Sequence, residues 1–362
     1  MRLGTCIALE LTCGVSIALG LGFGATWAQA ELRSRWSQER SAALTPPSPA
    51  ADHQIAPIEP SPVPEIVGEP ASLFVGVDDD LLVKPLRHAA LKHARMNRGG
   101  SSISLRVDLA NGARAAFKPR QLNSQTVPRK EVAAYRINRL LDLNSVPPAI
   151  GRKFRVDDLY AALVPSSRFY LPRLRREVVV QRGGWVIGEL SWWIPVIAKA
   201  TVDGFRIDTT NGIVTWKRYL TVGKTIPESA ATIVSQISSM VLFDFLIDNP
   251  DRWSGGNART SEDGATLYFM DNTMSFGGNH EGHLKARIYL RRSQKFSASL
   301  VRRLRTLTAA QVKAVVSHDV EPFAQLLSDL EVSALMSRRD KALAYIDRLI
   351  RRFGEERVLV FK

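Results

Sequence analysis

Cysteine is almost absent from this sequence, and its two copies, Cys6 and Cys13, both precede residue 30. Residues 1–30 have the pattern of a secretory signal, with a basic start at Arg2, an apolar middle and an A-x-A site at residues 28–30. Removal of this signal would leave no cysteine, so the remaining chain cannot depend on disulfides. A hydrophobic core must stabilise it, and a length of 362 residues with 45% hydrophobic residues permits one.

No asparagine lies in an N-x-S/T glycosylation acceptor. Together with the missing disulfides, this favours a bacterial envelope protein over a eukaryotic luminal one. We therefore expect an exported protein that is periplasmic or extracellular. An uncleaved membrane anchor is the alternative to a cleaved signal, although the glycines make the apolar run less hydrophobic than a good membrane span.

Residues 31–70 are rich in proline, alanine, serine and glutamate. This composition predicts a stiff, disordered tether that precedes the folded domain. The rest of the chain is strongly basic and gives a net charge of +14. The basic residues concentrate toward the C-terminus in four pairs, Arg291-Arg292, Arg302-Arg303, Arg338-Arg339 and Arg351-Arg352.

These arginine pairs are either solvated helix faces or a surface that attracts polyanions. Acidic lipid headgroups, anionic glycans and acidic protein segments are the candidate partners. Nucleic acid is not expected for an exported protein. Contact with a membrane is expected only if the N-terminal segment is uncleaved.

The first part of the folded chain has the pattern of strands with one important helix. Alternating apolar residues over 103–109 and 113–117 flank Asn111-Gly112, which predicts a hairpin. We expect helices over 78–97 and 129–143, and a strand-like segment around 158–164. Lys118 leaves the second hairpin strand on the face opposite Phe117.

The second part of the chain is predicted to be mainly helical. A helix over 228–247 becomes almost wholly apolar at its end, as expected for an element buried on all sides. Further helices are predicted over 298–307, 309–316, 320–330 and 332–353. A β-rich half followed by a helical half indicates an α+β fold with two lobes and a cleft between them.

The most informative stretch follows the buried helix. The helix leads directly into the loop that carries Asp251 and Arg252, and a short apolar strand over 267–270 then delivers Asp271. A carboxylate on a loop and a carboxylate at a strand end suit phosphoryl transfer, in which one accepts a hydroxyl proton and the other holds a metal ion. Taken singly, each residue could equally be an ordinary turn or surface charge.

Lys118 and Glu131 complete this arrangement, since a strand lysine can reach nucleotide phosphates and a helix carboxylate can fix it. Asp244 is a different kind of residue, because it lies between two phenylalanines in the buried helix end. A buried carboxylate must be hydrogen-bonded. We expect Asp244 to accept hydrogen bonds from the backbone of the following loop and so to fix Asp251.

Four blocks of the sequence resemble the secretory-pathway kinases, the family of the Golgi casein kinase, the xylosylkinase and four-jointed. They are AAFKPR (115–120), EVAAYRINRLLDLNSVPPAIGR (131–152), FDFLIDNPDR (243–252) and LYFMDNTMSFG (267–277). The chain is similar to this family from about residue 103 to residue 307. The lack of disulfides indicates a bacterial-type member.

The resemblance implies an atypical two-lobed protein-kinase-like fold over residues 71–362, with an N-lobe over about 71–200 and a C-lobe over about 201–362. It also implies the use of ATP with Mn²⁺ or Mg²⁺. By position, Lys118 and Glu131 would bind the nucleotide, Asp251 would be the catalytic base, and Asp271 and Asn257 would bind metal. The loop is one residue longer before Asn257 than in the family, and Trp253 replaces a common histidine.

We therefore expect an exported kinase that transfers the γ-phosphate of ATP to a hydroxyl of a protein (Ser/Thr) or of a glycan. The basic C-terminal surface favours an anionic acceptor. The alternative is a non-catalytic kinase-like envelope module that binds anionic polymers through that surface, because ATP is scarce outside the cytoplasm.

Overall fold

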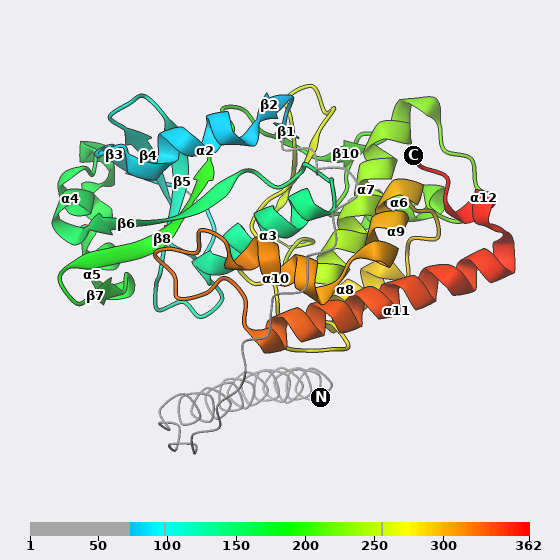
Figure 1. Ribbon diagram of the computed structural model, residues 1–362. Helices are drawn as coiled ribbons and strands as arrows, with labels where there is room; N and C mark the ends of the chain where they lie inside the picture. Colours follow the sequence, from blue (N-terminus) through cyan, green and yellow to red (C-terminus); the bar gives the residue numbers. More distant parts are fainter. Residues whose placement is uncertain (1–72, 98, 255) are drawn as a thin grey trace, which may run out of the picture. The chain divides into compact units, whose positions relative to one another are not determined.

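The computed structural model describes residues 73–97, 99–254 and 256–362, and the predicted signal and tether lie outside the described residues. Along this part, a β-rich half is followed by a mainly helical half (Figure 1). The two halves form the N-lobe and the C-lobe of the predicted α+β architecture.

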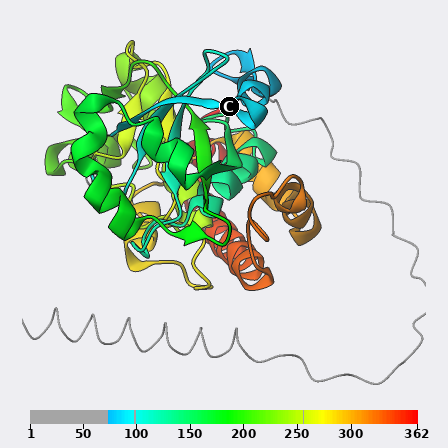
Figure 2. The ribbon, with the colours of Figure 1, turned by 90° about the vertical axis from the view of Figure 1, so that its left-hand side faces the viewer.

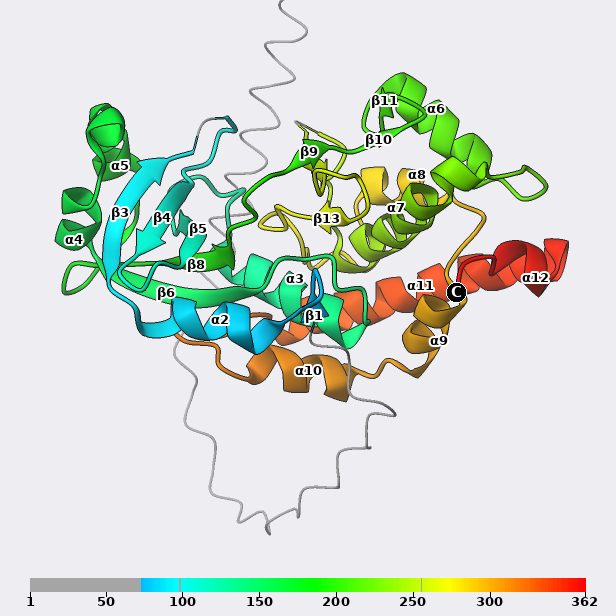
Figure 3. The ribbon, with the colours of Figure 1, turned by 90° about the horizontal axis from the view of Figure 1, so that it is seen from above.

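A six-stranded sheet builds the N-lobe. Its path is β3-β4-β5-β8-β6, and β7 also pairs with β8. The strands are β3 (Leu91–Met96), β4 (Leu105–Leu109), β5 (Arg114–Pro119), β6 (Ala149–Arg155), β7 (Val180–Gln181) and β8 (Trp185–Trp192). The predicted hairpin is β4–β5, and Gly112 in its turn has a φ of 86°, which glycine adopts without steric cost. Figure 3 shows this sheet at one end of the domain, with the helical C-lobe beyond it.

Three short helices cover the outer end of the sheet, in front in Figure 2. They are α4 (Val156–Ala161), η1 (Pro165–Tyr170) and α5 (Leu171–Glu177). The predicted strand around 158–164 is therefore wrong, since this segment begins within α4. Leu159 of α4 is buried in the N-lobe core, so its apolar side chain is part of a helix instead.

The predicted helix over 78–97 is wrong in its second half. Helix α2 covers Asp79–His88, and the residues after it form β3. Pairing with β4 places Ala94 opposite Val107 and buries both. Partners distant in sequence thus decide the structure of the segment, as is usual for strands.

Helix α3 (Pro128–Leu140) connects the lobes. It contacts β6 and β8 of the sheet, and its apolar face lies in the C-lobe core. At its start, Arg129 makes two hydrogen bonds of 2.8 Å to Glu331 of α11 (Asp329–Phe353). The helix that carries Glu131 is thereby held from both lobes.

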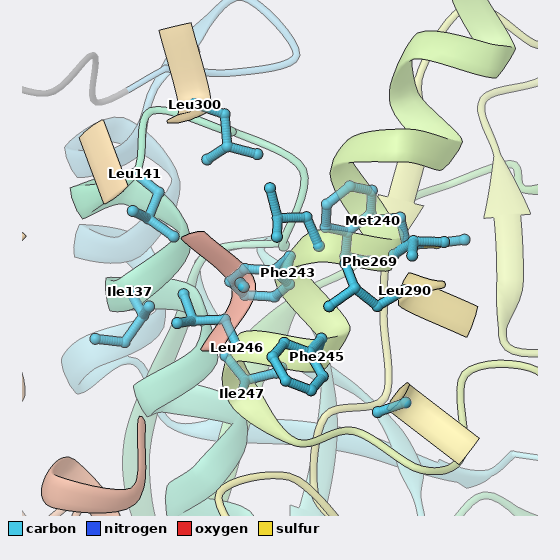
Figure 4. Close-up of a cluster of buried hydrophobic side chains, with 14 of the residues drawn as sticks. Ile137, Leu141, Met240, Phe243, Phe245, Leu246, Ile247, Phe269, Leu290 and Leu300 are labelled. Carbon is cyan, nitrogen blue, oxygen red and sulfur yellow. The ribbon is translucent and has the colours of Figure 1, made fainter. Parts of the chain in front are cut away.

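Helix α7 (Glu228–Ile247) is the central element of the C-lobe, and all residues from Met240 to Ile247 are buried. Figure 4 shows Phe243, Phe245 and Leu246 packed among side chains of neighbouring elements. By length and composition α7 could cross a membrane, but 72% of its most apolar window is buried inside the domain. Its hydrophobicity is therefore that of a core helix.

The remaining C-lobe helices are α6 (Thr210–Tyr219), α8 (Leu284–Leu290), α9 (Ala298–Thr306), α10 (Ala309–Ser317) and α12 (Glu355–Val358). Helices α9, α10 and α11 confirm three of the predicted helices. The predicted helix over 320–330 is wrong, because the chain there forms turns until α11 begins at Asp329. Ser328 and Glu331 form a capping box that sets this start.

A second sheet has three strands in the order β13-β12-β9. Strand β9 (Ala198–Lys199) follows the N-lobe, and β12 (Ala258–Thr260) and β13 (Leu267–Phe269) follow α7. Two small hairpins, β1–β2 and β10–β11, complete the described strands. They comprise β1 (Leu73–Phe74), β2 (Val77–Asp78), β10 (Thr201–Val202) and β11 (Phe205–Arg206).

Candidate active site

Asp251 lies on the loop that follows α7. The helix ends at Ile247, and the φ of 60° at the next residue, Asp248, turns the chain sharply. The backbone N–H of Asp251 donates to Oδ1 of Asn249 at 3.0 Å. Nδ2 of Asn257 donates to Oδ2 of Asp251 at 2.9 Å and to its carbonyl oxygen at 3.1 Å. One carboxylate oxygen is thus held by an amide, while the residue remains partly exposed.

Arg252 points into the protein and fixes this loop. Its Nε lies 3.2 Å from both carboxylate oxygens of Asp244, and the two side chains are 0% and 3% exposed. The guanidinium also donates to Oδ1 of Asn272 at 2.6 Å and to the carbonyl oxygen of Met270. Asp244 therefore pairs with a guanidinium, and the expectation that it accepts backbone hydrogen bonds is corrected. A carboxylate gains more from a buried charge-assisted pair than from neutral donors.

Burial raises the pKa of Asp244 to about 6, although the Arg252 guanidinium opposes the shift. The backbone N–H of Asn249 donates to the carbonyl oxygen of Asp244 at 2.8 Å, which closes the end of α7. Asp244 fixes the position of Asp251 indirectly, through Arg252.

Lys118 lies at the end of β5, with Nζ 2.6 Å from Oδ1 of Asp271 and 3.8 Å from Oε2 of Glu131. Burial alone would lower the pKa of Lys118, but the negative charges of Asp271, Glu131 and Glu189 outweigh it and raise the pKa. The lysine therefore remains an ammonium group. In return, Lys118 lowers the pKa of Asp271, which remains a carboxylate.

Glu131 joins α3 to the strand end that carries Asp271. Its Oε2 accepts from the backbone N–H of Asn272 at 2.6 Å, and its Oε1 accepts from Nδ2 of Asn272 at 2.9 Å. Burial raises the pKa of Glu131. The structure thus brings together Lys118 from a strand, Glu131 from a helix and Asp271 from a loop. Lys118 and Asp271 are 153 residues apart in the sequence.

Glu189 of β8 is a fourth member of this group, and sequence reasoning missed it. It lies directly opposite Lys118 in the β5–β8 pairing and is fully buried. Burial raises its pKa to about 8. The available signal was a single carboxylate among apolar residues in WVIGELSWW, but the partner strand of β8 was not predictable from the sequence.

A glycine lets the two strands approach at this point. A Cβ atom on Gly188 would lie 2.4 Å from the carbonyl oxygen of Lys118 and 2.5 Å from the ring of Phe117. Real Cβ atoms essentially never come so close to other heavy atoms, so only glycine fits here.

The residues present suit a hard divalent cation. Asp271 and Asn257 offer carboxylate and amide oxygens, the donors that Mg²⁺ and Mn²⁺ prefer. Within the described ranges, no group of three or more His, Cys, Asp or Glu side chains could hold a metal ion. The oxygens of Asp271 and Asn257 therefore match a cation that binds one or two protein oxygens and completes its coordination shell with substrate phosphates.

No family model matches the sequence. The human glycosaminoglycan xylosylkinase is 23% identical over an alignment of 299 positions, and the match covers 72% of this chain and 72% of that protein.

Among solved structures, the Golgi casein kinase has a TM-score of 0.61 at 16% identity, over 78% of this chain and 77% of that one. The same kinase with Mn/ADP bound has a TM-score of 0.60 at 16% identity, with 78% of both chains covered. A hydra Fam20 with sugar has a TM-score of 0.59 at 17% identity, over 79% of this chain and 94% of that one. The chain is therefore similar in sequence to the human glycosaminoglycan xylosylkinase and has the two-lobed kinase-like fold of the Golgi casein kinase.

Proposed function

We propose that this protein is an exported kinase that transfers the γ-phosphate of ATP to a hydroxyl group of a protein or glycan. The observation that carries the proposal is the convergence of Lys118, Glu131 and Asp271. The homologue named a xylosylkinase and the similar structure with Mn/ADP bound support this chemistry.

Lys118 is proposed to bind the phosphates of ATP. Its pKa is raised, so it offers a full positive charge at neutral pH. Glu131 orients the ammonium group and also holds Asn272, so one carboxylate sets the positions of both the lysine and the residue after Asp271. Such preorganised charge is the main catalytic contribution in phosphoryl transfer.

Asp251 is proposed to accept the proton of the acceptor hydroxyl. Asn257 holds Oδ2, which leaves Oδ1 to receive this proton as the hydroxyl oxygen attacks the γ-phosphorus. The oxygen–phosphorus bond to ADP breaks, and ADP leaves with the bonding electron pair. Arg252 holds the loop from its buried side and so keeps Asp251 in place.

Asp271 and Asn257 are the residues proposed to hold a divalent cation, Mn²⁺ or Mg²⁺. When bound, such a cation neutralises the charge of the phosphates. Asp271 has a φ of 60°, in the left-handed region, so the chain turns at this residue after β13.

Export to the periplasm or the extracellular space and an anionic acceptor are further parts of the proposal. They rest on the signal-like residues 1–30 and on the net charge of +14. Only some arginines of the four pairs contribute to the exposed basic surface. Arg338 is fully buried and donates to three carbonyl oxygens, and Arg303 pairs with Asp142, whereas Arg291, Arg302, Arg351 and Arg352 are exposed.

Thermal unfolding of the full chain with and without ATP plus Mn²⁺ or Mg²⁺ tests the proposal. A ligand present at 100 times its dissociation constant stabilises the native state by about 2.7 kcal/mol and so raises the midpoint. We expect a metal-dependent rise for wild type and for the control Glu262→Ala, which removes an exposed carboxylate, but none for Asp271→Ala.

The second candidate is a non-catalytic module that binds anionic polymer through the exposed arginines. It predicts polyanion binding with steep salt dependence and no metal-dependent nucleotide binding. Absence of a midpoint shift with either metal at millimolar ATP would favour this candidate over the kinase.

A further inference from the structure

Glu189 is a buried acid whose hydrogen bonds do not account for its presence. It is 0% exposed, and Oγ of Ser191 donates to its Oε2 at 2.7 Å. Among the described residues, its Oε1 has no hydrogen-bond partner. A buried carboxyl group with an unsatisfied oxygen destabilises a protein, so a purely structural origin is not favoured.

Glu189 lies opposite Lys118 in the sheet. The two residues are direct partners in antiparallel strands, so their side chains leave the same face of the sheet. Glu189 and Lys118 each feel the other's charge, which raises the pKa of the lysine and opposes the burial effect on the acid. Ser191 lies two residues along β8 on this same face and orients the carboxyl group.

The other two carboxylates near Lys118 have second tasks. Glu131 accepts two hydrogen bonds from Asn272, and Asp271 is the candidate cation ligand and also accepts from Thr273 at 3.2 Å. Glu189 has no such second task. It is thus the acid in the group that can serve the lysine alone.

We propose that Glu189 is a positioning residue that holds the Lys118 ammonium toward the β8 side of the site, independently of how Asp271 is used. This rests on the proposed function only in that Lys118 is taken to bind the nucleotide. Glu189 acts through Lys118 and is not proposed to touch ATP.

Nucleotide affinity in a double-mutant cycle tests the proposal. At pH 9, above the pKa of about 8 of Glu189, we expect Glu189→Gln to weaken binding of ATP with Mg²⁺ or Mn²⁺ about tenfold by calorimetry, because Lys118 is less well placed. In the Lys118→Met background the same substitution should change affinity less than about twofold, since the residue acts through the lysine. Equal losses in both backgrounds, or no loss in either, would overturn the proposal.

Thermal unfolding without nucleotide provides a readout that does not depend on ATP binding. The measurement is made at pH 9, above the pKa of about 8 of Glu189, so that this acid is ionised in wild type. Loss of Lys118 then leaves three acids without their cation, so Glu189→Gln should raise the midpoint more in the Lys118→Met background than in wild type, by about 2 °C or more. Additive effects would show that the two side chains do not interact. If wild type bound no nucleotide, the kinase proposal would fail, and this cycle alone would decide the role of Glu189.

A control separates positioning from general stability. Glu331 is also a buried acid, but it pairs with Arg129 and Lys130 and caps α11. Glu331→Gln should lower the midpoint equally in the wild-type and Lys118→Met backgrounds. If Glu189→Gln showed this same pattern, its role would be structural and the proposal would be wrong.

Discussion

The side-chain amide of Asn257 holds the carboxylate of Asp251 at 2.9 Å, although the two residues lie six positions apart in the sequence. Because the amide nitrogen donates to Asp251, the amide oxygen of Asn257 is left for another partner. The proposed base and one proposed cation ligand are therefore positioned by a single contact.

Asp251→Asn should abolish phosphoryl transfer without preventing nucleotide binding. The amide cannot accept the hydroxyl proton, so turnover should fall by about 10²–10⁴, the usual contribution of a general base. Transfer of labelled phosphate and calorimetry with ATP measure the two properties. A variant that turns over ATP as fast as wild type would exclude Asp251 as the base.

Glu131→Gln should weaken nucleotide binding, because the neutral amide no longer attracts the Lys118 ammonium and cannot accept both hydrogen bonds from Asn272. We expect a loss of about tenfold in affinity, since hydrogen bonds to charged groups contribute about 1.5–3 kcal/mol. Calorimetry with ATP and Mg²⁺ checks this. Glu177→Gln, which changes a half-buried acid of α5 in the same lobe, serves as the control and should bind ATP like wild type.

Arg252→Ala should destabilise the fold by about 3–5 kcal/mol, because it leaves the buried Asp244 carboxylate without its partner. Arg252→Lys should recover little of this, since an ammonium cannot reproduce the guanidinium contacts to Asp244, Asn272 and Met270. Urea unfolding measures the loss. Arg302→Ala, which removes an exposed arginine, should change stability by less than about 0.5 kcal/mol.

Glu189 should make the folded state less stable as the pH rises from about 5 to 8. Burial raises its pKa from 4.5 to about 8, so in this window the folded protein keeps a proton that the unfolded chain has released. Because the folded state binds more protons, stability falls with rising pH, by at most about 1.4 kcal/mol per pH unit. Urea unfolding across this range should show a steeper decline for wild type than for Glu189→Gln, and parallel curves would contradict the assignment.

Local patterns in the sequence predicted the elements that depend on nearby residues. The hairpin around Asn111-Gly112, the buried helix ending at Ile247 and the helix beginning at Ala309 all follow from neighbours within a few positions. The helix predicted across Leu91–Met96 failed because strand pairing with β4 decided that segment. Propensity alone cannot reveal a partner strand.

The same distinction applies to the site. Lys118, Glu131, Asp251, Asn257 and Asp271 were identified from order, context and resemblance, and the structure shows which of them lie together. Their roles stay predictions until tested. Glu189 could not be found because its importance depends on the register between β5 and β8. The Asp244 partner was also missed, because the direction of the Arg252 side chain is set by the folded loop.

Gly188 has a consequence for comparing related sequences. An added methyl group would force the backbone of β5 away from β8 and would carry the Lys118 ammonium with it. A relative could therefore keep every charged residue of the site and still have an inactive one, if this glycine were replaced. A comparison of the acidic and basic residues alone would overlook such a pseudoenzyme, whereas a substitution at the position of Gly188 would reveal it.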